Sequence, residues 1–159
     1  MKLTNTHIYK QNIDAIYESC INKDFIKTKM AALGARNIEV SIQKKGDSVT
    51  VEIIREMPID VPNVFKSFIN TWSKMTQTEV WKGATGGPYY CNITIKVHSA
   101  PLDIQGQMKL MTHESGTAVA SITEVNCTIP FIGKALTNFI GETSKKAIEK
   151  EFEYIGEYV

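Results

Sequence analysis

The amino-acid sequence predicts an α+β protein in which a curved antiparallel sheet of about seven strands wraps around one long C-terminal helix. Strand-like alternation through the middle of the chain, two short helical segments near the N-terminus and one long amphipathic segment after Pro130 support this fold class. The 159 residues are 43% hydrophobic and 22% charged, a composition that can bury the core of one globular domain. We therefore expect a single domain over residues 1–159.

The first third of the chain predicts a strand, two short helices and a β-hairpin. Gly34 follows the last apolar residue of the second helical segment and is expected to end it. The KKGD turn separates two segments that alternate between apolar and polar residues, as the strands of a hairpin do. The elements are a strand at 3–10, helices at 13–20 and 23–33, and hairpin strands around 38–42 and 49–53.

The middle third predicts an irregular segment followed by an antiparallel meander. In DVPNVFKSFINTW, Pro62 suits a first helical turn, and this segment is either a short helix or a structured loop. It is also a candidate lid over a binding site, the alternative being a packed segment that closes one end of the sheet. Four strands follow, separated by the turn sequences GATGGP, SAP and HESG, at 74–81, 90–97, 102–111 and 117–129.

The segment after Pro130 predicts an amphipathic helix that spans the whole sheet. A helix of about 25 residues is about 37 Å long, whereas strands of about 9 residues reach roughly 30 Å. A curled sheet closed by one helix leaves space between the two unless large side chains fill it. The apolar side of the helix thins in the middle, at the small residues Gly141, Thr143 and Ala147, so we expect a cavity.

This order of elements resembles the helix-grip fold of the START-like superfamily, also called SRPBCC, which includes the birch pollen allergen. The segments AALGARNIEV, VTVEIIREMPIDVP, TQTEVW, SAPLDIQGQMKL and EVNCTIPFIG are, in this order, similar to a bacterial SRPBCC group described only as a domain of unknown function. Members of the superfamily bind lipids, sterols or polyketides, cyclise polyketides, or act as chaperone cofactors, so the resemblance implies a fold but no single activity. Ser121 and Thr123 depart from the more apolar pattern expected in the last strand, which predicts a more polar inner wall.

Two charged residues continue the apolar faces of neighbouring strands. Strict alternation places Arg55 and Glu79 on the inner wall, where each needs a partner to offset desolvation. A slip of one residue would instead place them in a solvent-facing ion pair. On the inner wall, Arg55 would supply a planar donor fork that anchors a ligand headgroup or carboxylate.

The remaining candidate lining residues are aromatic, methionine, aliphatic or small polar side chains that could surround an apolar ligand. Part of this set would be ordinary core. Together with Arg55 and Glu79, the candidates are Met57, Phe65, Phe68, Trp72, Met75, Gln77, Trp81, Tyr89, Met108, Leu136, Phe139, Ile140 and Thr143.

The sequence carries no motif that requires catalysis, a metal or a cofactor. It lacks GxSxG and HExxH, and its three histidines lie on separate segments. GATGGP lacks the GK[ST] ending of a phosphate-binding loop and is a hairpin turn in our interpretation. No catalytic residue, metal ligand or cofactor is therefore expected, although a buried Glu79 near Tyr89 or His98 could abstract a proton from a bound substrate.

The charge and hydropathy of the sequence limit the classes of partner that we expect. The formal net charge of +1 gives no basic footprint for nucleic acid, and no segment approaches the roughly 20 apolar residues of a membrane span. The three cysteines are far apart and predict buried thiols in a cytoplasmic protein. A monomer or a homodimer is compatible with the sequence.

We therefore expect non-catalytic binding or transport of a hydrophobic small molecule or lipid between the sheet and the C-terminal helix. One alternative is a cyclase- or dehydratase-like enzyme that acts on a polyketide-like or other apolar substrate. A second is a protein-interaction module resembling a chaperone cofactor, with Ala118, Ala120 and Ile122 on an exposed sheet face.

Overall fold

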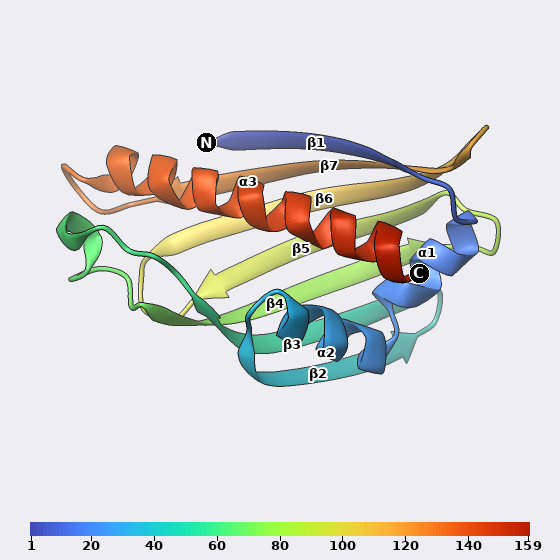
Figure 1. The fold of residues 1–159 in the computed structure, drawn as a ribbon, viewed down its shortest axis with the longest axis horizontal. Coiled ribbons are helices and arrows are strands. Elements are labelled where there is room, and N and C mark those ends of the chain that lie inside the picture. Colours follow the sequence, from blue (N-terminus) through green and yellow to red (C-terminus); the bar gives the residue numbers. More distant parts are fainter.

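A computed structural model describes all 159 residues and contains one seven-stranded sheet and three α-helices (Figure 1). The strands are β1 Lys2–Tyr9, β2 Arg36–Lys45, β3 Ser48–Pro58, β4 Trp72–Gly83, β5 Tyr89–Val97, β6 Leu102–His113 and β7 Gly116–Cys127. The helices are α1 Ile13–Cys20, α2 Lys23–Ala32 and α3 Gly133–Tyr158, with one 3-10 turn, η1, at Asn63–Phe65. None of the helices is long and apolar enough to cross a membrane.

The sheet is antiparallel throughout, in the order β1-β7-β6-β5-β4-β3-β2. Strands β2 to β7 form a meander, because each pairs with the next along the chain. Strand β1 pairs with β7 at the opposite edge, so α1 and α2 carry the chain from one edge of the sheet to the other (Figure 1). This architecture confirms the predicted fold class.

Local capping explains where the two short helices begin and end. The side chain of Asn12 accepts a hydrogen bond from the backbone N–H of Asp14, and that of Asn22 accepts one from Phe25. Both satisfy N–H groups that a first helical turn leaves free. Gly34 follows α2 with φ +96°, a left-handed conformation that glycine adopts without strain.

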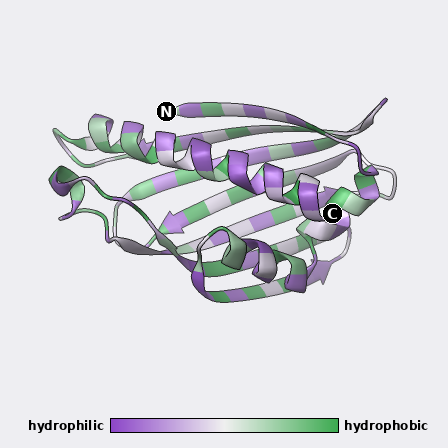
Figure 2. Ribbon diagram, viewed as in Figure 1, coloured by the Kyte–Doolittle hydropathy of each residue, from purple (hydrophilic) through white to green (hydrophobic).

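Alternation along the strands gives the sheet one face toward α3 and one toward solvent, visible as alternating colours along the strands in Figure 2. Helix α3 runs across the inner face and packs mainly against β7 and β1 (Figure 1). Its buried residues lie near its two ends and are Gly133, Leu136, Ile140, Gly141, Phe152 and Ile155. No residue between Gly141 and Phe152 is fully buried.

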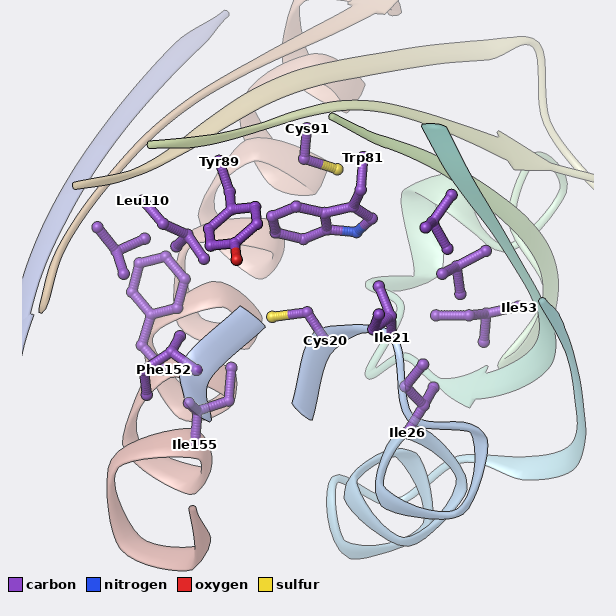
Figure 3. Packing of buried hydrophobic residues seen from close by; sticks show 14 of the residues in the cluster. Cys20, Ile21, Ile26, Ile53, Trp81, Tyr89, Cys91, Leu110, Phe152 and Ile155 are labelled. Carbon is purple, nitrogen blue, oxygen red and sulfur yellow. The ribbon is translucent and has the colours of Figure 1, made fainter. Parts of the chain in front are cut away.

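The interior is divided into two apolar clusters. The first joins α1, α2 and the C-terminal end of α3 to the sheet, with Trp81, Tyr89, Cys20 and Phe152 among its members (Figure 3). The second lies at the other end of the sheet, and its members are Ile59, Val61, Phe65, Ile69, Val97, Leu102, Ile104, Val125, Leu136 and Ile140.

The segment between β3 and β4 is a loop that contains one 3-10 turn, which settles the choice that the sequence left open. Ile59, Val61, Phe65 and Ile69 of this segment are all buried in the second cluster. The Phe65 ring stacks on that of Phe139 in α3, with 5.5 Å between the ring centres. The loop therefore closes this end of the sheet by packing against α3.

Candidate ligand-binding site

A chain of hydrogen bonds lies on the inner faces of β3 and β4. Arg55 Nη2 donates to Gln77 Oε1 at 2.9 Å, and Gln77 Nε2 donates to Glu79 Oε1 at 2.6 Å. The indole N–H of Trp81 donates to the second oxygen of Glu79 at 2.9 Å. All four side chains are buried, so strict alternation placed Arg55 and Glu79 on the correct face and a solvent-facing ion pair is excluded.

An ion pair between α2 and α3, with a buried lysine and a partly exposed glutamate, lies close to these hydrogen bonds. Lys29 Nζ of α2 is 2.5 Å from Glu151 Oε1 of α3, and Lys29 is only 5% exposed. Burial disfavours the charged form of both groups, but the opposite charges nearby have the larger effect. The pKa of the Glu151 carboxyl is lowered, and the pKa of the Lys29 ammonium is raised. The pair is therefore ionised at neutral pH.

Glu79 has the opposite behaviour. Burial raises the pKa of its carboxyl, and this effect exceeds the opposing effects of the Lys29 ammonium and of the hydrogen bond from Trp81. Glu79 and Glu151 are thus distinguished by their partners. Glu151 holds a cation directly, whereas Glu79 accepts hydrogen bonds from neutral groups on both of its oxygens.

Arg55 is the least satisfied polar group of the site. Arg55 is 8% exposed, and its Nε and Nη1 atoms are buried without any hydrogen-bond partner. Burial lowers the pKa of the guanidinium, yet an arginine side chain remains protonated at neutral pH in proteins. The structure therefore holds a buried cation with unused donors.

The inner face is least covered at the centre of its strands. On β5, Ile93 and Ile95 face inward but are only half-buried, whereas Cys91 and Val97 on either side of them are buried. The inward-facing Met108 of β6 and Thr123 of β7 are also half-buried. Helix α3 crosses this inner face (Figure 1), and its middle part contributes no buried residue.

A hollow of about 250 Å³ lies between β1 and the middle of α3. Leu3, Asn5, Ser121 and Ile148 are among the residues that line it. Ser121 pairs in register with Met108, so this hollow meets the sheet's inner face beside the half-covered region. None of the lining residues predicted from the sequence borders it, which places this hollow nearer β1 than we expected.

The structure brings most of the predicted lining residues to the inner side, in three groups. The polar group is Arg55, Gln77 and Glu79, with Trp81 in the first apolar cluster beside it. Half-buried inward residues are Met57, Met75 and Met108. The closed end holds Phe65, Phe68, Leu136, Phe139 and Ile140.

Three predicted residues lie elsewhere or are already engaged. Trp72 does not line the inner wall: it has the outward parity of β4, is 36% exposed, and its ring lies 3.8 Å from the Arg36 guanidinium. The Tyr89 hydroxyl donates to Asp14 at 2.6 Å, so it is held toward α1. Thr143 Oγ1 donates to the backbone of Phe139 at 3.0 Å.

Glu79 forms no hydrogen bond with Tyr89 or His98, the two residues with which the sequence suggested it could abstract a proton. His98 is exposed and bonds Thr76 at 2.8 Å, away from the interior that holds Glu79. Tyr89 is bound to Asp14. No group of three or more side chains is arranged to hold a metal ion.

Two residues of the site were missed at the level of the sequence, Lys29 and Glu151. Both have a helical signal that could have identified them. Lys29 lies three residues after the buried Ile26, a spacing that places both on one side of α2. Glu151 lies four residues before the buried Ile155, and so belongs to the inward side of α3.

Comparison with known proteins places this geometry in a family. A family described as "Protein of unknown function (DUF2505)" matches residues 4–159. The chain belongs to this family. A search of curated proteins found no match to the chain.

Solved structures show that this DUF2505 protein shares the helix-grip, START-like fold. The protein TTHA0849 from Thermus thermophilus is 12% identical, with a TM-score of 0.67 and coverage of 99% of this chain and 95% of that one. Ara h 8.0201 is 10% identical with a TM-score of 0.59, covering 98% and 97%. The di-domain ARO/CYC StfQ of the steffimycin biosynthetic pathway is 8% identical with a TM-score of 0.65, and the match covers 99% of this chain and 49% of that one.

Proposed function

We propose that this protein binds an apolar small molecule or lipid between the inner face of the sheet and helix α3. The observation that carries the proposal is the half-buried centre of the inner face, at Ile93, Ile95, Met108 and Thr123, on the face that α3 crosses. When a ligand covers apolar side chains that are partly exposed on a concave surface, the burial favours binding. The favourable free energy is about 25 cal/mol per Å² of apolar surface removed from water.

The chemistry of the surrounding wall supports a binder. Met57, Met75 and Met108 are unbranched and adapt their shape to a ligand. The polar groups of the site are few and lie together on β3 and β4, which is typical of sites that fix the orientation of a mostly apolar molecule. No pair of free acid and base groups faces this region, and we therefore propose binding without catalysis.

Native mass spectrometry of the protein purified from the organism that produces it tests the proposal. We expect a co-purifying apolar molecule that organic solvent extracts, together with saturable binding of the neutral dye Nile red to the extracted protein. Competition between the dye and the extracted molecule would show that both use one site. Protein that is consistently empty and does not bind the dye would overturn the proposal.

A further inference from the structure

We propose that the bound molecule carries a carboxylate, and that Arg55 holds this group at the β3 side of the site. The ligand would then be an amphiphile of the fatty-acid type, with an anionic end on Arg55 and an apolar body along the inner face. This inference rests on the proposed function and goes beyond it, since it names the chemical class of the ligand.

Arg55 has more hydrogen-bond donors than the protein uses. A guanidinium has five N–H donors in a fixed fork, and here one nitrogen, Nη2, donates to Gln77. Nε and Nη1 are buried and have no partner. Buried donors are rarely left unpaired, because each costs about 1–3 kcal/mol. A planar carboxylate takes two parallel hydrogen bonds from one side of the fork, here from the remaining N–H of Nη2 together with either Nε or Nη1.

No protein carboxylate near the site accepts a hydrogen bond from Arg55. Both oxygens of Glu79 accept hydrogen bonds, from Gln77 and Trp81. Glu151 is paired with Lys29 through Oε1, and it acts on Arg55 through its charge without a hydrogen bond. No protein carboxylate therefore completes the donors of Arg55, and a carboxylate of a ligand can do so.

Arg55 lies beside the half-covered region of the inner face. Arg55 pairs in register with Met75 of β4, and Gln77 on the same strand pairs with Ile95 of β5. Neighbouring strands are about 4.8 Å apart, so Ile95 lies about 10 Å from β3 across the sheet. A molecule with its carboxylate on Arg55 would lay its apolar body over Met75, Ile95 and Ile93.

The test compares decanoate with 1-decanol by isothermal titration calorimetry at pH 8, where the acid is ionised. The two probes share one apolar chain and differ in the headgroup. We expect the wild-type protein to bind decanoate about 10- to 100-fold more tightly, as a buried charge-assisted hydrogen bond provides. Acetate, which has the headgroup alone, is expected not to bind measurably.

Two arginine variants assign the effect. Arg55→Met keeps much of the length of the side chain but has no donor, so decanoate is expected to lose its advantage while 1-decanol binds as before or more tightly. Arg36→Met is the matched control, because Arg36 contacts Trp72 and Glu56 on the outer side of the sheet. This variant is expected to leave the ratio of the decanoate and 1-decanol affinities unchanged.

The outcomes are distinguishable. Equal affinity of the wild-type protein for the two probes overturns the carboxylate and leaves the binding function standing, a comparison that requires no variant to fold. An advantage for decanoate that persists in Arg55→Met overturns the role of Arg55. If neither probe nor Nile red binds, the proposed function fails together with this inference.

Discussion

Glu79 is the residue whose protonation links the site most directly to the stability of the fold. Burial raises the pKa of its carboxyl above the ordinary value, which is about 4.3 in an unfolded chain. The folded protein thus holds the Glu79 proton more tightly than the unfolded chain does. Its contribution to stability is fully present below that unfolded pKa and is lost as pH rises through the folded pKa.

The raised pKa of Glu79 predicts how the stability of the protein depends on pH. The free energy of unfolding of the wild-type protein is expected to fall as pH rises from about 4.5, because Asp14, Glu56 and Glu151 have lowered pKa values and act at lower pH. Glu79→Gln is uncharged at every pH and should remove this part of the slope. Urea unfolding of both proteins between pH 4 and 8 measures it, and parallel curves would contradict the prediction.

Arg55 and Glu79 also show what the sequence can predict about single side chains. Their parity along β3 and β4 follows from the period of two, and the structure places both side chains inside. Lys29 and Glu151 meet although 122 positions separate them, and a contact of that kind depends on how α2 and α3 pack. Trp72 was assigned by its residue type to the segment before β4, whereas the strand begins at Trp72 and its parity turns this side chain outward.

Turns are the elements where local backbone geometry determines stability. Gly116 starts β7 with φ +143°, and an added Cβ would meet the backbone oxygens of Tyr9 and Lys10. Gly46, in the turn between β2 and β3, has φ +60° with nothing within 4 Å of an added Cβ. The two glycines therefore separate backbone strain from steric overlap.

This contrast gives a prediction at the element scale. Gly46→Ala is expected to lower the free energy of unfolding by about 1 kcal/mol, the cost of a left-handed conformation for a residue with a Cβ. Gly116→Ala adds an overlap with main-chain atoms that cannot move away independently, and should cost more than about 3 kcal/mol. Denaturant unfolding of the two variants measures the difference, and similar losses for both would show that the β1 end gives way easily.

The elements themselves were predictable because their signals are local. Alternation, the Asn12 and Asn22 caps and Gly34 lie within or beside the segments they define. The loop between β3 and β4 differs, since it is held by contacts such as that of Phe65 with Phe139 in α3. Helical spacing of its apolar residues could not distinguish a helix from a loop that packs the same residues.

At the scale of the whole molecule, the decisive quantity is the separation between α3 and the centre of the sheet. The sequence predicts that the helix spans the sheet and that its apolar side thins in the middle, and the structure has no buried residue between Gly141 and Phe152. How far apart the two layers lie depends on side chains from every strand together with the loop and α2. That distance therefore could not be obtained from any one segment, and the hollow beside Ser121 was not anticipated.

Two substitutions on β7 distinguish a binding site from a filled core. Thr123 and Val125 face inward one pleat apart, but Thr123 is half-buried and Val125 is 0% exposed. If room for a ligand exists, Thr123→Leu fills part of it, so the free energy of unfolding should stay the same or rise while the affinity for Nile red falls. Val125→Leu, the matched control, adds a methylene to a packed position and is expected to cost about 1–3 kcal/mol. A loss of that size in Thr123→Leu as well would mean that side chains already fill the centre, which would leave no place for the proposed ligand.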